Sequence, residues 1–352
     1  METKKKLLSI SVPLFAVMLA FLIGAIIIAA LGASPVDSVV YLFQGAFGSK
    51  TNIGNTLVKA TPLIFTGLCA CFAYRCGVFN LGGEGQFIMG SVAAIWVATS
   101  WGIEGKGAAT AALLLGLVAG GIWGAIPGIL KIVRGLNEMI VSIMLNYVAT
   151  LFMGYIYTLV LRDGSVPQTL PVPDATKLTR AIPGMRATTG LLIALALAVA
   201  IYYFLFYTSK GFQLRAVGLN PTASRFNGFP INKFILVSFI VSGAIAGMGG
   251  AAELLGTQFR LMSGYGLGFG FDGVAIALIA QRNPIATVLV AYFFAVLRVG
   301  ATTMQVGAGV PTSVIEIIQA LVIVFAVAGT ALVRLPEIQQ LLVSRAAKKE
   351  EK

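Results

Sequence analysis

The chain has 352 residues, of which 58% are hydrophobic and only 11% are charged. Soluble domains are nearer half apolar and a quarter charged, so this composition excludes a soluble globular protein and favours a membrane protein. The net charge of +12 does not favour nucleic-acid binding. The lysines and arginines stand between long apolar blocks, where such residues set the orientation of a membrane protein.

Apolar blocks long enough to cross a hydrocarbon core of about 30 Å recur along the chain, and we count about ten of them. The first follows three lysines and imitates a signal peptide. Its apolar run of about 25 residues exceeds the 7–15 of such a peptide, so we expect an uncleaved span. A shorter apolar stretch at 36–47 is predicted to be an interfacial helix. The predicted spans cover residues 7–31, 55–74, 85–101, 107–130, 138–161, 187–207, 234–252, 264–280, 284–299 and 313–333.

The distribution of lysine and arginine gives these spans an orientation. With the N-terminus inside, about twice as many of these residues lie inside as outside, in agreement with the positive-inside rule. The basic loop 209–232 and the tail 334–352 are then cytoplasmic, and the proline-rich loop 162–186 is extracellular. We therefore expect residues 1–352 to form a single polytopic membrane domain with both termini in the cytoplasm.

Small residues recur at every fourth position in two of the predicted spans. This spacing lets the backbones of two helices approach closely in lipid, where no hydrophobic driving force brings helices together. We expect these two spans to pack tightly against other helices. The residues are Gly116, Gly120, Gly124 and Gly128 in the fourth span, and Gly243, Gly247 and Ala251 in the seventh.

The two halves of the chain share a weakly similar sequence pattern. The third span is preceded by "NLGGEGQF" and the eighth by "GLGFGFDGVA", each a glycine-rich break with an acid, Glu84 or Asp272, before a helix. Five spans in each half give the halves opposite orientations. The sequence therefore predicts an all-α integral membrane protein with broken or re-entrant glycine-rich segments and two five-helix halves of inverted topology, which many transporters use to build a site.

The residue types present do not favour an enzyme. The chain has no histidine, the commonest general base and triad partner. The stretch "GAFGSKT" lacks the spacing of a phosphate loop, so we expect neither an ATPase site nor a cofactor in this chain. Three cysteines, Cys69, Cys71 and Cys76, are interpreted as buried small hydrophobes, because without histidine they do not make a zinc site, and no metal is expected.

Polar residues inside the predicted spans are costly there and are therefore functional candidates. They gather in "CGVFNLGGEGQFIMG" and "RGLNEMIVSIMLNYVA". At 3.6 residues per turn, Asn137 and Asn146 lie about 180° apart on a helix, whereas Glu138 and Asn146 lie about 80° apart and could share a face. Arg298 lies near the end of the ninth span but deeper in its apolar run than Glu253 and Glu316 in theirs, so an interfacial, snorkelling role explains it less easily.

Four stretches in this order resemble membrane permeases of ATP-binding-cassette importers, in the group that carries branched-chain amino acids, simple sugars and nucleosides. They are "FNLGGEGQFIMG", "LNEMIVSIMLNYVA", "RAVGLNPTASRFNG" and "GLGFGFDGVAIALIAQRNP", and the resemblance covers about residues 54–334. The "IMLNY" pattern is most similar to bacterial nucleoside importers. The resemblance implies a permease in a bacterial cell membrane. Its implied partners are a separate ATPase that binds ATP, a second and different permease subunit, and an extracellular substrate-binding lipoprotein of the basic-membrane-protein type.

The resemblance also gives the loop 209–232 a role, because in such importers a short helix of this loop docks into the ATPase. The sequence suits a short helix, with Asn220 as N-cap, Pro221 at the first position and Gly228 at the end. Related permeases often carry "EAA" after the proline, whereas this chain has "TAS". The residues that match the docking pattern are Ala216, Gly218, Leu219, Asn220, Pro221, Ala223, Arg225, Phe226 and Gly228.

Nucleosides are mostly uncharged, so a path of amide and aromatic groups suits them, with Phe79 among the rings that could stack on a base. Two alternatives stay open: a sugar or riboflavin permease of the same class, and a proton-coupled carrier that uses Glu84, Glu138 or Glu316. A proton-coupled carrier has no need of the docking loop. The predicted substrate-path residues are Asn80, Glu84, Gln86, Phe87, Asn137, Glu138, Asn146, Tyr147, Phe271, Asp272 and Arg298.

Overall fold

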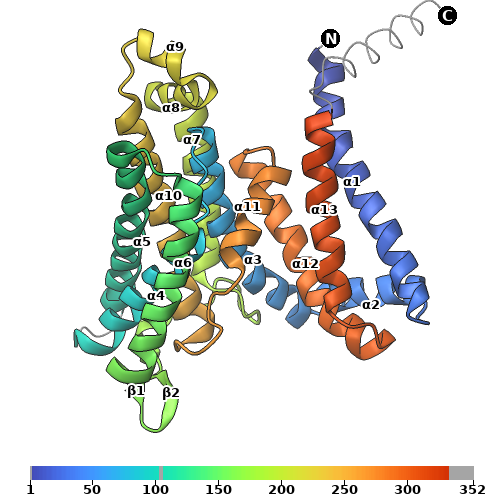
Figure 1. The fold of residues 1–352 in the computed structure, drawn as a ribbon. Coiled ribbons are helices and arrows are strands. Elements are labelled where there is room, and N and C mark those ends of the chain that lie inside the picture. The colour runs from blue at the N-terminus through green and yellow to red at the C-terminus, as the bar shows by residue number, and fades with distance from the viewer. Residues whose placement is uncertain (1, 103–105, 333–352) are drawn as a thin grey trace, which may run out of the picture. The chain divides into compact units, whose positions relative to one another are not determined.

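A computed structural model of the chain describes residues 2–102 and 106–332, without the side chains of residues 2–14, 16, 106 and 330–332. The predicted cytoplasmic tail 334–352 lies outside these ranges. The described part is helical apart from one short hairpin (Figure 1). It divides into two compact units, a smaller one of residues 2–48 with 296–332 and a larger one within residues 49–295.

The smaller unit is built from both ends of the chain. Between α1 and α2 the chain bends by 116°, and the Ser34 side chain caps α2 by accepting a hydrogen bond of 3.3 Å from the backbone N–H of Asp37. The stretch predicted as an interfacial helix is therefore a separate helix, and Gly300 of α12 lies against the backbone of its Leu42. The elements are α1 (Glu2–Ala30), α2 (Pro35–Phe47), the end of α12 (Pro284–Ala308) and α13 (Ser313–Leu332).

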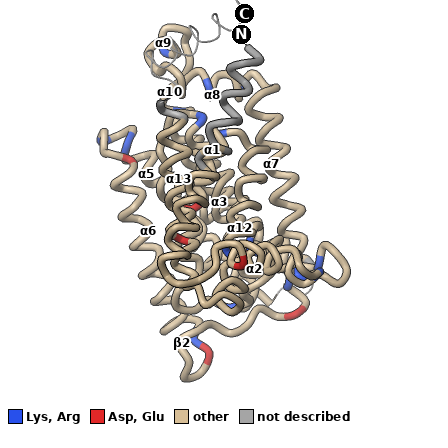
Figure 2. The backbone as a smooth tube through the Cα atoms, turned by 90° about the vertical axis from the view of Figure 1, so that its right-hand side faces the viewer, with Lys and Arg blue, Asp and Glu red and all other residues tan. Residues whose placement is uncertain are grey.

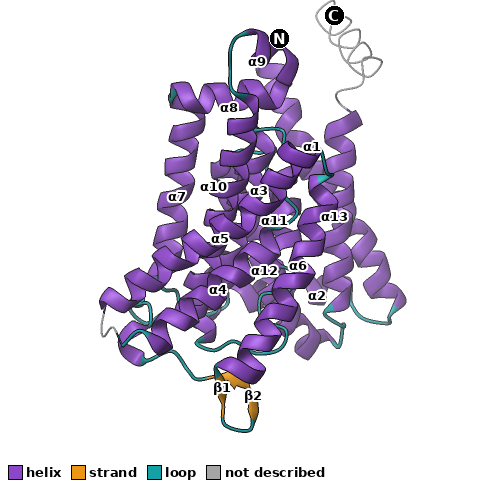
Figure 3. Ribbon diagram, turned by 60° about the vertical axis from the view of Figure 1, so that its left-hand side comes forward, coloured by secondary structure: helices purple, strands orange, loops and turns teal. Residues whose placement is uncertain are grey.

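The larger unit is centred on α10, which packs against α3, α4 and α5. Short π-helical turns, η1 (Ile156–Val160) and η3 (Leu254–Gln258), continue α6 and α10. Figure 3 shows the hairpin of β1 (Arg162–Asp163) and β2 (Val166–Thr169) at one end of this unit and α8 and α9 at the other. Its helices are α3 (Lys50–Arg75), α4 (Gly83–Ser100), α5 (Lys106–Arg134), α6 (Glu138–Tyr155), α7 (Thr189–Tyr207), α8 (Ser209–Leu219), α9 (Pro221–Phe226), α10 (Ile231–Glu253), α11 (Phe269–Ile279) and the beginning of α12.

Glycine contacts hold α4, α5 and α10 together, as the four-residue spacing predicts. A Cβ atom added to Gly247 of α10 would lie 2.3 Å from the carbonyl oxygen of Gly116 on α5. One added to Gly90 of α4 would lie 2.1 Å from the carbonyl oxygen of Gly247, and one added to Gly120 would lie 2.3 Å from that of Gly243. The three backbones are therefore in direct contact, which gives the larger unit a rigid centre.

The helix lengths define a polytopic membrane protein but do not establish ten spans. In the described part, six helices are long and apolar enough to cross a membrane, or seven if α1 and α2 count as one bent span. Each predicted span coincides with a helix, yet α11 has 11 residues, a length of about 16 Å. The predicted span 264–280 is shorter than expected because Gly264, Gly266 and Gly268 have positive φ angles of 80°, 73° and 85°, so the helix begins only at Phe269. In Figure 2 the Lys and Arg residues of the larger unit lie toward the two ends of its helices.

The loop between α6 and α7 is ordered against the end of α10. Its backbone N–H groups donate from Thr169 to Leu261 O (3.0 Å), from Val172 to Phe259 O (2.8 Å) and from Leu178 to Leu255 O. An ion pair at 3.2 Å joins Arg260 Nη1 to Asp163, and within the loop Lys177 holds the pKa of the Asp174 carboxyl below its usual range. The predicted proline-rich loop is thus a folded cover on one end of the larger unit.

Candidate functional site

The helical structure is interrupted between α3 and α4, and we call this interruption the helix break. A network of buried side-chain amides fixes its backbone. Asn80, in the connecting segment, and Gln86, on the first turn of α4, exchange two hydrogen bonds of 3.0 Å. The Asn80 amide also donates to Ser242 Oγ of α10 at 2.8 Å, and its Oδ1 accepts from the backbone N–H of Gly82 at 3.0 Å. The break is therefore fixed to the central helix by side chains that water does not reach.

Asn146 of α6 holds the same break from the other side. Its Oδ1 accepts a hydrogen bond of 2.8 Å from the backbone N–H of Gly85, and its Nδ2 donates to the carbonyl of Leu81 at 2.9 Å. It thereby satisfies a backbone donor in the first turn of α4 that has no partner within the helix. A Cβ on Gly85 would lie 2.9 Å from this Oδ1, so the contact needs a glycine there.

The two glycine-rich breaks with similar sequences are in contact in the structure. The carboxylate of Glu84 accepts a hydrogen bond of 2.8 Å from the backbone N–H of Gly268, directly before α11. A Cβ added to Gly270 would lie 2.3 Å from the backbone nitrogen of Glu84, so the first turns of α4 and α11 touch through their backbones. Asp272 on the first turn of α11 is near enough for its charge to act on Glu84.

Two groups can be distinguished among the predicted substrate-path residues of the larger unit. Those at the break, together with the fully buried Phe87, are enclosed by protein, and they set the shape of the backbone around the two helix starts. The aromatic side chains of Tyr147 and Phe271 are 65% and 49% exposed, so their rings remain accessible for contact. Arg298 belongs to the smaller unit, on the second half of α12.

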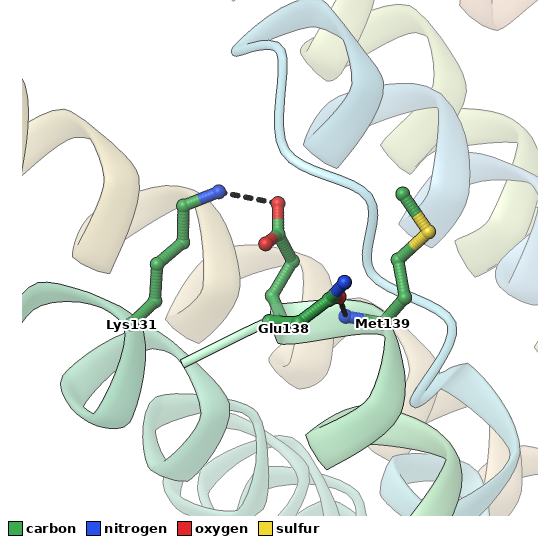
Figure 4. Close-up of polar contacts among 4 residues, drawn as sticks. Lys131, Glu138 and Met139 are labelled. Carbon is green, nitrogen blue, oxygen red and sulfur yellow. Dashed lines mark hydrogen bonds and ion pairs between the residues drawn. The ribbon is translucent and has the colours of Figure 1, made fainter. Parts of the chain in front are cut away.

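Glu138, at the start of α6, is tied to the end of α5. Figure 4 shows that it turns back to form an ion pair with Lys131, near the end of α5. Asn137 caps α6 by accepting a hydrogen bond of 2.9 Å from the backbone N–H of Met139. These two residues therefore fix the turn from α5 to α6.

The ion pair between Lys131 and Glu138 should show measurable coupling in a double-mutant cycle. Their side chains are only 29% and 12% exposed, so we expect Lys131→Met and Glu138→Gln each to destabilise the turn, with a coupling of about 1 kcal/mol. Hydrogen exchange at residues 135–139 and thermal unfolding measure the effect. As a control, Arg134→Gln, at an exposed side chain, should combine additively with Glu138→Gln; coupling of the same size there would contradict a specific pair.

The loop that matches the docking pattern forms the two helices α8 and α9 with the predicted caps. Asn220 accepts a hydrogen bond of 3.0 Å from the backbone N–H of Ala223, and Pro221 takes the first helical position. Beyond α9, Gly228 has a φ of 74°, as expected of a residue that ends a helix. Leu219 and Phe226 are 85% and 89% exposed, and a groove of about 380 Å³ runs between α8 and α9.

Gly218 has a role in the fold that its sequence context did not reveal. A Cβ added to Gly218 would lie 2.3 Å from the carbonyl oxygen of Arg75 and 2.8 Å from the backbone nitrogen of Gly77. The backbone of α8 therefore rests on the last residues of α3, at the start of the segment that leads to Asn80. Ser242 and Gly268, which complete the network at the break, were likewise missed, because only the folded chain brings them to their partners.

A mainly helical chain with several apolar spans, a fixed helix break and a capped, exposed helical loop defines a polytopic membrane transport protein. Residues 52–327 match the family described as "Branched-chain amino acid transport system / permease component", and the chain belongs to this family.

Three relatives are similar over nearly their whole length. The guanosine ABC transporter permease protein NupP of Bacillus subtilis is 38% identical over 93% of this chain and 96% of the relative. The glucose ABC transporter permease protein TsgB13 of Haloferax volcanii is 34% identical over 90% of this chain and 87% of its own length. The nucleoside ABC transporter permease protein NupB of Lactococcus lactis is 34% identical over 96% of both chains.

Proposed function

We propose that this chain is the permease subunit of an ATP-binding-cassette importer for nucleosides. The observation that carries the proposal is the similarity, over more than nine tenths of the chain, to a permease named for guanosine and another named for nucleosides. In this proposal the chain forms the path, a separate ATPase binds ATP, a substrate-binding lipoprotein delivers the ligand outside, and a second permease subunit completes the path. The chain itself needs no cofactor.

The proposed membrane arrangement has ten spans in two inverted halves in a bacterial cell membrane, with both termini in the cytoplasm. It is supported by the meeting of the two glycine-rich breaks, one from each half, at Glu84 and Gly270. In this arrangement α11 completes its span together with the glycine-rich segment before it, since about 16 Å of helix does not cross a core of about 30 Å. The positive-inside rule supports a cytoplasmic position of α8 and α9.

In the proposed mechanism, the ATPase moves α9, and α9 moves the helix break. The contacts that support this route are continuous along the chain: α9 follows α8, Gly218 of α8 touches the end of α3, and the segment after α3 carries Asn80. ATP binding would favour one of two arrangements of these elements, and the amide network would shift as a body with the first turn of α4. The exposed rings of Tyr147 and Phe271 would then contact the base.

Uptake by the complete importer tests this function. The chain is reconstituted in proteoliposomes with its ATPase, second permease subunit and binding lipoprotein, and offered labelled guanosine, other nucleosides, glucose and riboflavin. We expect nucleoside uptake that requires ATP and survives collapse of the proton gradient, because the energy enters through the ATPase. ATP-driven uptake of glucose alone would instead favour the sugar permease. The 34% identity to the glucose permease is the observation that supports this alternative. Uptake that needs only the proton gradient would overturn the importer.

A further inference from the structure

Three arginines from different elements meet at the end of the larger unit that carries α8 and α9. Arg75 is the last residue of α3, Arg215 lies on α8, and Arg282 lies in the turn between α11 and α12. The guanidinium carbons of Arg75 and Arg215 lie 5.0 and 4.9 Å from the centroid of the same ring, that of Phe206 on α7. The Nε of Arg75 donates a hydrogen bond of 2.6 Å to the carbonyl of Arg282. We call Arg75, Arg215 and Arg282 the arginine cluster.

The positive charge of the arginine cluster is not compensated by the described part of the chain. Arg215 and Arg282 both lie within electrostatic range of Arg75. Within the described ranges, no Asp or Glu forms an ion pair with any of the three. Like charges gathered at one place repel one another, so an anion beside the arginine cluster would be favoured.

One donor of the arginine cluster is buried without a partner. The Nε of Arg215 makes no hydrogen bond to the described residues, although its atom is shielded from solvent. A buried donor without an acceptor is unusual and costs free energy in a folded protein. It indicates that an acceptor from outside the chain completes the arrangement, and a planar guanidinium fork is best matched by the oxygens of a phosphate or carboxylate.

The backbone that carries Arg282 is strained to hold it in place. Gln281 and Arg282 have φ angles of 52° and 60°, in the left-handed region that glycine adopts without cost but other residues do not. The turn is closed by a hydrogen bond of 2.9 Å from the backbone N–H of Arg282 to the carbonyl of Ala277. Strained, non-glycine turns of this kind persist where the position of the residue matters.

The arginine cluster lies where lipid headgroups are expected. The candidate spans α3 and α7 end at Arg75 and Tyr207, and the end of α7 carries the rings of Tyr202, Tyr203, Phe206 and Tyr207 in contact with one another. Aromatic residues at the end of a span mark the interface between membrane and water. Basic pockets between spans at this level are suited to the headgroups of anionic lipids.

We propose that the arginine cluster binds a phosphate group, and that an anionic phospholipid of the adjoining leaflet supplies it. The bound phosphate accepts hydrogen bonds from Arg215 and Arg282 while Arg75 stays tied to the Arg282 carbonyl. The lipid thereby joins the end of α3, the base of α8 and the turn before α12. That the leaflet is the cytoplasmic one rests on the proposed orientation of the permease, but the site itself does not.

Lipid binding to the full chain tests the proposal. The chain is placed in nanodiscs of phosphatidylcholine, with and without phosphatidylglycerol, and bound lipid is measured by native mass spectrometry alongside thermal unfolding. We expect phosphatidylglycerol to be retained and to raise the unfolding temperature. Arg215→Gln and Arg282→Gln should each weaken its binding about fivefold, the effect of one basic residue near an anionic surface. Arg215→Lys, which keeps the charge, should weaken it less.

Two further arms separate the sources of the anion and control for folding. Arg134→Gln removes an exposed charge at the end of α5 and should leave lipid binding unchanged. If inorganic phosphate stabilises the protein in phosphatidylcholine and phosphatidylglycerol adds nothing, the phosphate site stands and its lipid source is wrong. Equal behaviour of both lipids with no effect of phosphate overturns the site. An Arg215→Gln protein that still binds phosphatidylglycerol but no longer binds the ATPase would also overturn the site.

Discussion

Gly247→Ala is expected to prevent the larger unit from folding, although it adds a single methyl group. The new Cβ would lie 2.3 Å from the carbonyl oxygen of Gly116 and 2.7 and 2.9 Å from the Cα and N atoms of Gly120. All three are backbone atoms, so no side chain can turn away to make room. Overpacked cores lose about 1–3 kcal/mol even where side chains can adjust. We therefore expect a loss above about 3 kcal/mol, seen as the disappearance of the monodisperse peak of the detergent-solubilised protein.

Gly154→Ala is the matched control for this prediction. Gly154 lies on α6, also in a candidate span, and the nearest atom to an added Cβ is the Tyr157 hydroxyl at 3.9 Å. Since alanine favours a helix over glycine by about 1 kcal/mol, this variant should be as stable as the parent or slightly more so. A Gly247→Ala protein that elutes and unfolds like the Gly154→Ala protein would refute the close contact of α5 and α10.

These glycine contacts show which part of the fold was accessible from the sequence. Residues spaced by four lie on one side of a helix, so the ladder from Gly116 to Gly128 predicts a packed face without knowledge of its partner. The caps of α9 were predicted for the same reason, because Asn220, Pro221 and Gly228 act on their own neighbours along the chain. In both cases the residues that interact, or that form the revealing pattern, are close to one another along the sequence.

The candidate site was less accessible because its contacts join distant segments. Asn80 and Ser242 are separated by 162 positions, and no local pattern pairs them. The helical-wheel argument for Glu138 treated α6 alone, whereas the partner of Glu138 is Lys131, across the turn from α5. Polar residues in a predicted span therefore indicated where the backbone departs from a regular helix. They did not reveal which of these residues use their hydrogen bonds to stabilise the irregular backbone.

Phe226→Asp is expected to abolish transport while the permease stays folded, if α9 docks into the ATPase as proposed. The ring of Phe226 is 89% exposed, so its loss removes no internal packing. At a docking surface, however, an aromatic anchor contributes more than about 2 kcal/mol, and a carboxylate in its place must be desolvated on docking. We expect uptake and co-purification of the ATPase to fall by at least about thirtyfold, with an unchanged unfolding temperature of the permease.

Thr222→Glu gives the control for Phe226→Asp, because it introduces the same charge on the same short helix. Its carboxylate would sit in the first turn of α9, where the helix dipole favours a negative charge, and permeases that resemble this chain often carry glutamate after the proline. We expect it to retain both the ATPase and uptake. Gly218→Asp cannot serve the same purpose, since the contact of Gly218 with the carbonyl of Arg75 means that any side chain there displaces α8. If the Phe226→Asp and Thr222→Glu proteins support uptake equally well, α9 does not couple the ATPase to the permease. The proposed route from α9 through Gly218 to the helix break is then wrong as well.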